Sequence, residues 1–98
     1  MSIYHSKKNK PYVYMCTERD TGRFYIGYRY RNYLPAEEDF GNRYFTSNKY
    51  VKKNFDRFDW QIIAEFYDKK DAYKFEGELI RETKSPLQIN QDKYKRQL

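Results

Sequence analysis

The stretch YVYMCTERDTGRFYIGYR, residues 12–29, decides the fold. It holds two tyrosine-bearing segments, Tyr12-Val13-Tyr14 and Tyr25-Ile26-Gly27, with ten residues between them. Both segments are typical of β-strands, because aromatic and β-branched residues are enriched there. The intervening Asp20-Thr21-Gly22 has the composition of a turn. The stretch therefore predicts one β-hairpin over about residues 11–30.

Side-chain alternation gives this hairpin two different faces. If Tyr14 lies opposite Tyr25 or Gly27, one face carries phenols and a guanidinium. We call it the tyrosine face, and its members are Tyr12, Tyr14, Tyr25 and Arg29. The other face is apolar, and its members are Val13, Met15, Phe24 and Ile26. With Gly27 among the phenols, the tyrosine face is predicted to suit a phosphate group, although tyrosine is also ordinary strand composition.

The composition describes one small basic domain. The 98 residues include 12 Tyr, 7 Phe and 1 Trp, so aromatic rings must fill much of the core. The net charge of +6 favours a polyanionic partner, with a merely soluble basic protein as the alternative. A single cysteine, Cys16, excludes an internal disulfide and a Cys-rich zinc site. The chain has a single histidine, His5, which argues against a histidine-metal nuclease and against a Ser-His-Asp hydrolase.

No apolar run approaches the roughly 18 residues of a membrane span, and the N-terminus has no signal-peptide core. We therefore expect no membrane partner and a cytoplasmic location.

The remaining patterns predict an α/β protein of the α+β type: a small three-stranded antiparallel sheet flanked by helices. The expected strands are 11–17, 23–30 and 59–67, and the expected helices are 47–57 and 69–83. Alternation in the third strand places Trp60, Ile62, Ala64 and Phe66 on one side. One helical turn is expected at 34–39 and an extended segment at 87–90. The expected domain spans 11–91, between a flexible basic arm at 1–10 and a basic tail at 92–98.

The expected helix at 47–57, with Thr46 or Ser47 as its N-cap, has one apolar and one basic side. The basic side carries Lys49, Lys52, Lys53 and Arg57, with Asp56 among them. This stripe is consistent with phosphate binding and equally with a solvated face.

A carboxylate interrupts the apolar stripe of the expected helix 69–83. The stripe consists of Ala72, Phe75, Leu79 and Ile80, and Glu76 falls within it. A carboxylate facing a core costs several kcal/mol unless a cation or hydrogen bonds compensate. Three explanations stay open: Glu76 bends out to solvent, pairs with an arginine, or ligates Mg²⁺, which takes one or two protein carboxylates.

Together these elements resemble the GIY-YIG nuclease family. Its members have two short strand motifs, an arginine beyond the second, a helix-borne glutamate and often an asparagine near the end. The corresponding positions are Tyr12-Val13-Tyr14, Tyr25-Ile26-Gly27, Arg29, Glu76 and Asn90. The resemblance covers roughly residues 11–91. Stand-alone or homing-type endonucleases of tailed phages are similar in carrying a tyrosine–arginine pair, here Tyr28-Arg29, after the second motif.

The chain departs from the family pattern in three ways. Tyr12 stands where members usually have glycine. Many members place the arginine further along on a helix, so Arg31 and Arg43 remain alternatives to Arg29. Some members carry a histidine in mid-domain, and this chain has none there, so proton transfer would rest on tyrosine, lysine or water.

The resemblance implies a DNA endonuclease that hydrolyses phosphodiester bonds in double-stranded DNA with a single Mg²⁺ or Mn²⁺. Glu76 would hold the metal, and Arg29 would neutralise charge on the phosphate. Tyr14 or Tyr25 would orient or deprotonate the attacking water, and Asn90 would fix local geometry. The products would be a 5′-phosphate and a 3′-hydroxyl. A phage-encoded protein would act in the host cytoplasm, and an oligomer on DNA is left open.

Three other functions compete with this interpretation. A non-catalytic nucleic-acid-binding module would use its tyrosines to stack on bases. Glu82-Thr83-Lys84 spells the ExK of PD-(D/E)xK nucleases, but it ends a predicted helix, whereas that motif belongs on a strand. A small phage protein that binds a host protein is the third.

Overall fold

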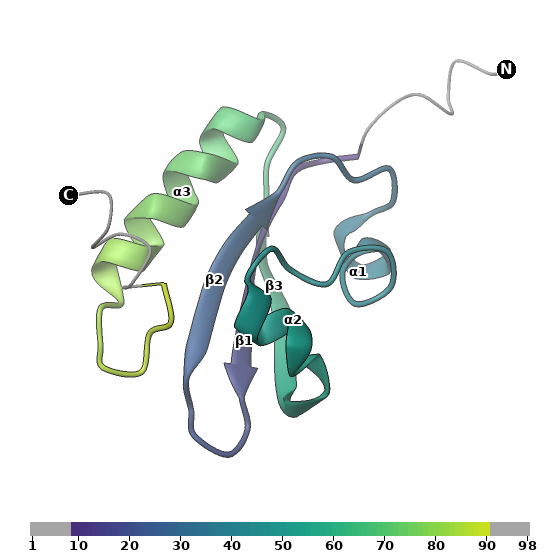
Figure 1. Ribbon diagram of the computed structural model, residues 1–98. Coiled ribbons are helices and arrows are strands. Elements are labelled where there is room, and N and C mark those ends of the chain that lie inside the picture. The colour runs from purple at the N-terminus through teal and green to yellow at the C-terminus, as the bar shows by residue number, and fades with distance from the viewer. Residues whose placement is uncertain (1–8, 91–98) are drawn as a thin grey trace, which may run out of the picture.

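The computed structural model describes residues 9–90, which form an α+β fold around one three-stranded antiparallel sheet (Figure 1). The strands are β1 (Tyr12–Glu18), β2 (Phe24–Arg29) and β3 (Phe58–Glu65). The helices are α1 (Ala36–Asp39), α2 (Lys49–Lys53) and α3 (Lys69–Glu82), with a 3-10 turn at Phe55–Arg57. The three predicted strands are thus confirmed. The predicted basic tail at 92–98 and most of the predicted arm at 1–10 lie outside the described residues.

The hairpin pairs β1 with β2 in one of the two expected registers, with Tyr14 opposite Gly27. Its turn closes through hydrogen bonds from the Gly22 amide to Glu18 O and from the Glu18 amide to Arg23 O. Gly22 has φ +78°, a left-handed conformation that glycine adopts without steric cost. The sheet order is β2-β1-β3, so the hairpin supplies both the central strand and one edge.

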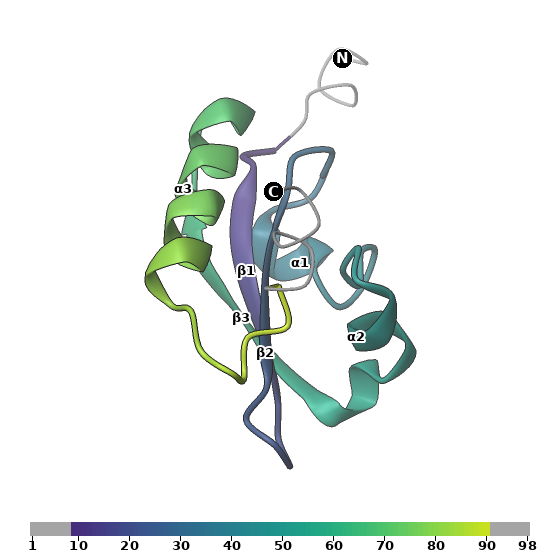
Figure 2. The ribbon, with the colours of Figure 1, turned by 60° about the vertical axis from the view of Figure 1, so that its left-hand side comes forward.

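Helices cover both faces of this sheet (Figure 2). The helix α3 packs on the apolar face, where Val13 and Ile26 form one core cluster with Ala72 and Ile80. The segments α1 and α2 cover the tyrosine face, where a second cluster consists of Tyr12, Tyr14, Cys16, Tyr25, Ala36, Phe40, Val51 and Phe58. The division of the hairpin into an apolar face and a tyrosine face is confirmed, and each face has its own core.

The third strand does not keep the predicted alternation. The β1–β3 register shifts between Val13 and Tyr14, whose partners are Ala64 and Ile62, so Ile63 is an extra residue. A bulge of one residue moves every later side chain to the opposite face. Trp60 and Ile62 therefore pack with the tyrosine-face core, whereas Ile63 and Phe66 pack with the α3 core.

The predicted helix at 47–57 is shorter than expected. The helix α2 covers only Lys49–Lys53, and its N-cap is Asn48, whose side chain accepts a hydrogen bond from the Val51 amide. Thr46 is not the cap because its φ of +93° lies outside the conformations that lead into a helix. The chain then tightens into the 3-10 turn before β3.

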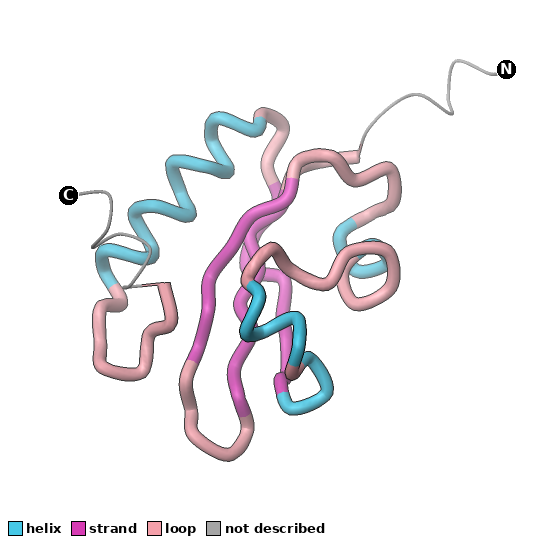
Figure 3. Tube along the Cα trace, in the orientation of Figure 1, coloured by secondary structure: helices cyan, strands magenta, loops and turns pink. Residues whose placement is uncertain are grey.

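The other expected elements agree more closely. The helix α3 begins after Asp68, whose carboxylate accepts from the Lys70 amide. The turn α1 follows Pro35 as expected. Most of the chain between β2 and α2 is loop (Figure 3). Residues 87–90 form a turn with one parallel bridge, Gln88 to Phe24, rather than an extended segment.

None of the helices found in residues 9–90 has the length and apolarity needed to span a bilayer.

Candidate functional site

Tyr14 lies across the glycine of the second motif. A Cβ placed on Gly27 would meet the Tyr14 hydroxyl at 2.4 Å and its ring carbon Cζ at 2.5 Å. No side chain can share that space, so Gly27 is required by the close approach of the ring. The glycine of the second motif thus leaves room for the tyrosine of the first motif.

The loop at 44–48 supplies hydroxyl partners to both candidate tyrosines. The Tyr14 hydroxyl lies 2.9 Å from Thr46 Oγ1 and 3.4 Å from the Tyr44 hydroxyl. The Tyr25 hydroxyl lies 3.3 Å from Ser47 Oγ. Thr46 holds its position at a positive φ that costs energy for a β-branched residue. Strain of this kind persists where the surroundings over-determine it, as this hydrogen-bonded cluster does.

Arg29 is anchored by a buried carboxylate that the sequence did not single out. Asp39 is 1% exposed, and its Oδ2 accepts from Arg29 Nε at 2.8 Å and from the Tyr12 hydroxyl at 2.5 Å. The guanidinium also lies 4.3 Å from the centre of the Tyr44 ring, in a cation–π contact. Asp39 therefore fixes both the first residue of the first motif and the candidate catalytic arginine.

Burial keeps the phenols of the tyrosine face neutral. It raises the pKa of Tyr14 well above its usual range, and the neighbouring Tyr44 and Tyr25 add to the rise. Burial also raises the pKa of Tyr25 to about 12, a rise that the hydrogen bond to Ser47 opposes and the charge of Glu76 increases. These phenols are hydrogen-bond donors at neutral pH. They do not have the lowered pKa that a resident tyrosinate base would need.

Most of the tyrosine face, which the sequence predicted to suit a phosphate group, is covered by other parts of the chain. Tyr12, Tyr14 and Tyr25 are at most 3% exposed, because α1, α2 and the loop between them pack over the rings. Solvent reaches this side through a depression of about 180 Å³. Its lining consists of Tyr28, Arg29, Tyr30, Arg31 and Tyr44. A phosphate would therefore meet Arg29, Arg31 and Tyr44 first, with Tyr14 behind Tyr44.

Glu76 occupies the predicted position in the apolar stripe. It is 2% exposed and lies on the buried side of α3 with Ala72 and Ile80. Its charge raises the pKa of Tyr25 and also that of Tyr28, where burial is the larger cause. The carboxylate is therefore close enough to Tyr25 and Tyr28, the two tyrosines of β2, to act on both electrostatically. Bending out to solvent, one of the explanations left open, is wrong.

Asn90 fixes the outer side of β2. Its Oδ1 accepts from the Ile26 amide at 2.8 Å, and its Nδ2 donates to Ile26 O at 2.7 Å. The side-chain amide thus pairs with the strand as another peptide group would. Asn90 is 1% exposed, which fits the expected role in local geometry and not a contact with substrate.

The alternative arginines and the basic stripe lie on the surface. Arg31 lines the depression beside Arg29, whereas Arg43 does not line it. The members of the predicted DNA-binding stripe are all exposed: Lys49, Lys52, Lys53 and Arg57. Exposure fits phosphate binding and a solvated face equally well.

A metal ion at this site would be held by Glu76, because the other buried carboxylate, Asp39, is bound to Arg29 and Tyr12. Within residues 9–90, no three side chains of His, Cys, Asp or Glu gather closely enough to hold a metal. Mg²⁺ does not require such a group, since it binds through one or two carboxylates, several waters and substrate phosphates. Glu76 supplies one carboxylate beside the β2 tyrosines. The donor set therefore fits Mg²⁺ or Mn²⁺ bound together with DNA and does not fit a dedicated protein cage.

Four contributors to the cluster were not predicted as site residues from the sequence: Asp39, Tyr44, Thr46 and Ser47. Asp39 follows Ala36 by three residues, and both are buried on the inner side of α1. That spacing could have identified it, because positions i and i+3 of a helical turn share a face. Nothing local marks Tyr44 or Thr46, since a long loop brings them to the sheet.

Fold and site together define an α+β domain with a buried cluster of tyrosines beside a paired arginine and a buried glutamate. Comparisons with protein-family models, curated proteins and solved structures found no match to this chain. The GIY-YIG resemblance therefore remains a prediction from the motif residues and their spacing in the sequence.

Proposed function

We propose that this protein is a metal-dependent DNA endonuclease of the GIY-YIG type, similar to the stand-alone or homing-type enzymes of tailed phages. In that case it cleaves double-stranded DNA in the cytoplasm of the host cell. The observation that carries the proposal is the grouping at β2 of Tyr14 over Gly27, Tyr25 with the buried Glu76, and Arg29 at the adjacent depression. Phosphodiester hydrolysis needs this combination of a cation for the phosphate, a carboxylate for a metal and donors that orient water.

Each side chain has a role in this proposal. Arg29 binds the phosphate and is held ready by Asp39. Tyr14 and Tyr25 act as neutral donors that orient the attacking water or a phosphate oxygen, in keeping with their raised pKa values. Glu76 holds the metal, which when bound supplies Lewis acidity and stabilises the leaving oxygen. Asn90 keeps β2 in register with residues 87–90.

A plasmid-nicking assay tests the proposal. Supercoiled DNA should be nicked or linearised with Mg²⁺ and left intact with EDTA. Glu76→Gln keeps the shape of the side chain and removes its charge, so it should abolish nicking while circular dichroism shows an unchanged fold. Cleavage by Glu76→Gln at the wild-type rate would show that the carboxylate holds no metal.

The tyrosines can be tested by deleting one hydroxyl at a time. Tyr14→Phe or Tyr25→Phe should lower the cleavage rate by about 10²–10⁴-fold if its hydroxyl orients the water. DNA affinity should barely change, because the charged contacts come from Arg29 and the lysines. Arg29→Ala should weaken both affinity and rate, and normal cleavage by both tyrosine variants would remove the phenols from the mechanism.

A second candidate function is a non-catalytic nucleic-acid-binding module of the same fold. The raised pKa values of the buried tyrosines and the pairing of Arg29 with Asp39 favour it. Salt-dependent DNA binding without any metal-dependent nicking would support this function and overturn the endonuclease.

A further inference from the structure

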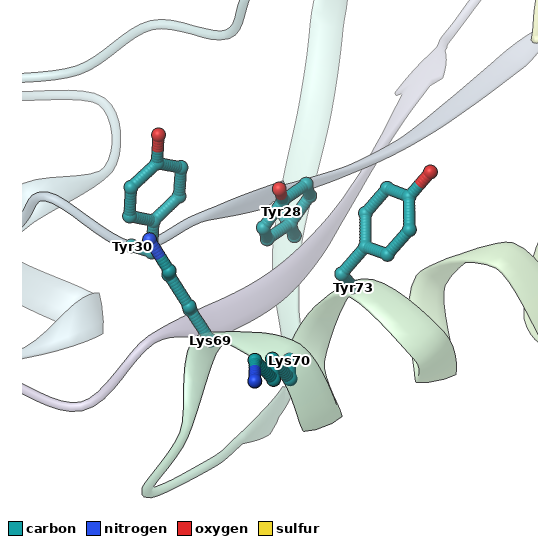
Figure 4. A pocket seen from close by; sticks show the side chains of 5 residues that line it. All are labelled: Tyr28, Tyr30, Lys69, Lys70 and Tyr73. Atoms are coloured by element: carbon teal, nitrogen blue, oxygen red, sulfur yellow. The ribbon is translucent and has the colours of Figure 1, made fainter.

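A second depression lies on the other side of the β2 edge, against the first two turns of α3. Its volume is about 270 Å³, and Figure 4 shows its lining side chains. They are Tyr28, Tyr30, Lys69, Lys70 and Tyr73. We call it the stacking pocket. None of these residues has a part in the chemistry proposed above.

The rings of the stacking pocket form a platform with one open ring. The Tyr28 and Tyr30 rings are nearly parallel, at 22° with centroids 5.7 Å apart. Tyr73 approaches Tyr28 edge-on at 5.5 Å and remains 60% exposed. An aromatic side chain exposed to this extent contributes little to the core, so its position beside two other rings favours a role in binding a flat partner.

The charge of the stacking pocket is entirely positive among its lining residues. Lys69 and Lys70 are exposed, and Lys69 Nζ lies 4.9 Å from the centre of the Tyr30 ring. A flat ring that carries an anion would place the ring on the tyrosines and the anion on the lysines. A nucleotide has this combination of an aromatic base and a phosphate.

We propose that the stacking pocket binds an unpaired nucleotide of a DNA strand. The base stacks on the exposed Tyr73 ring, beside Tyr28, and its phosphate contacts Lys69 and Lys70. This inference rests on the proposed function for the choice of DNA, and it assigns a substrate class to that function. A base inside a duplex cannot reach these rings, because its faces are covered by its neighbours.

The size of the stacking pocket supports a single base. Ligand sites for drug-sized molecules run from about 300 to 1,000 Å³, and this hollow of about 270 Å³ falls just below that range.

Two neighbouring depressions give the unpaired strand a path. The depression at Arg29 shares Tyr28 and Tyr30 with the stacking pocket. A third depression of about 250 Å³ shares Tyr73 and continues along α3 past Lys74, Gly77 and Arg81. A strand that follows these depressions passes from the candidate catalytic arginine over the tyrosines to further cations. The preferred substrate is therefore DNA with an unpaired stretch next to the scissile phosphate.

Binding measured without metal tests this proposal separately from catalysis. Fluorescence anisotropy in EDTA compares a labelled ten-nucleotide single strand with its matched duplex. Tyr73→Ala should weaken single-strand binding by about 5- to 150-fold, the loss expected for one stacked base, and should affect duplex binding far less. Tyr73→Phe should bind as the wild type does, because it keeps the ring. Tyr33→Ala is the matched control, since Tyr33 is 57% exposed and lines none of the three depressions.

The lysines provide a second measurement. Replacing Lys69 and Lys70 by Gln should reduce the slope of single-strand affinity against salt by up to about 1.4 units if both contact phosphates. Lys84→Gln, an exposed lysine beyond α3, should leave that slope unchanged. Wild-type single-strand affinity in Tyr73→Ala, or an unchanged slope in the double lysine variant, would overturn the stacking pocket.

The two proposals fail differently. If the wild type does not nick plasmid with Mg²⁺ but Tyr73→Ala still loses single-strand binding, the result supports the stacking pocket and contradicts the endonuclease proposal. If the wild type nicks plasmid and Tyr73→Ala binds single strands normally, the result supports the endonuclease proposal and contradicts the stacking pocket.

Discussion

At the residue scale, Gly27 and Gly77 differ in the space that is available for a side chain. A Cβ on Gly27 would lie inside the Tyr14 ring, whereas one on Gly77 would meet only the flexible end of Arg81, at 3.4 Å. Gly27→Ala should therefore destabilise the protein by about 1–3 kcal/mol, the usual cost of overpacking a core. Gly77→Ala is the control and should stabilise by roughly 1 kcal/mol through helix propensity. Urea unfolding of both variants measures the difference, and equal stabilities would contradict the close approach of Tyr14 to Gly27.

The first position of the first motif also has a residue-scale consequence. The family likeness predicts that the Tyr12 hydroxyl is dispensable for cleavage, yet this hydroxyl donates to the buried Asp39. Tyr12→Phe leaves that carboxylate one hydrogen bond short, so we expect a loss of roughly 1–3 kcal/mol in the free energy of unfolding. The cleavage rate per folded molecule should not change. Unfolding curves together with the nicking assay separate the two effects, and unchanged stability would show that the bond to Asp39 contributes nothing.

At the element scale, Asn90 fastens residues 87–90 to the outer side of β2. Asn90→Ala removes both side-chain bonds to Ile26 and leaves a buried amide and carbonyl without partners. Stability should fall by about 1–3 kcal/mol for each unsatisfied group that stays buried. Hydrogen exchange at the Ile26 amide should accelerate more than exchange at β1 amides. Asn42→Ala, which removes a bond on the exposed side of α1, is the control.

The helix α2 tests whether its basic stripe binds DNA. Replacing Lys49, Lys52 and Lys53 together by Gln should flatten the salt dependence of duplex affinity by up to about three units if all three contact phosphates. The three side chains are exposed, so the fold should not change. Anisotropy titrations at several salt concentrations give the slope, and a slope equal to that of the wild type would make this stripe a solvated face.

Local signals were enough to predict the strands, the hairpin and α3, because each depends on alternation, a turn or a cap within a few residues, but they left two hairpin registers open. The bulge at Ile63 could not be predicted in this way. The alternation of Trp60, Ile62, Ala64 and Phe66 is regular, and only pairing with β1 inserts the extra residue. The early end of α2 has a similar origin, since the chain must turn back at Asn54 to begin β3.

The candidate site likewise has a part that local sequence patterns predict and a part that depends on long-range contacts. The motif residues Tyr14, Tyr25 and Glu76 follow from spacing and helix periodicity. Their burial under a long loop, and the anchoring of Arg29 by Asp39, depend on contacts between residues far apart in the sequence. No periodic pattern encodes such contacts. The sequence therefore predicted on which elements Tyr14, Tyr25 and Glu76 lie. It predicted neither the loop residues that join them nor that most of their surface is closed to solvent.

At the scale of the whole molecule, burial of phenols links stability to alkaline pH. The pKa of Tyr25 is raised from 10.0 to about 12 in the folded protein. Below pH 10 both states keep the proton and the full stability is present; between pH 10 and 12 only the unfolded state releases it, so stability falls. This one group accounts for a loss of roughly 2 kcal/mol by pH 12. Chemical denaturation at pH 8 to 12 measures the loss, which Tyr25→Phe should reduce, and equal pH dependence in that variant would contradict the raised pKa.

The packing of Trp60 allows tryptophan fluorescence to report on the segments that cover the tyrosine face. The chain has one tryptophan, and its indole lies 5.1 Å from the Phe40 ring centre and close to the backbone of Gly41. Any outward movement of α1 and its loop would change the surroundings of that indole before it changed those of α3. Trp60 emission would then report how often the tyrosine cluster is uncovered. Quenching of this emission by iodide or acrylamide, with and without DNA, would show whether DNA binds to the molecules in which the cluster is uncovered.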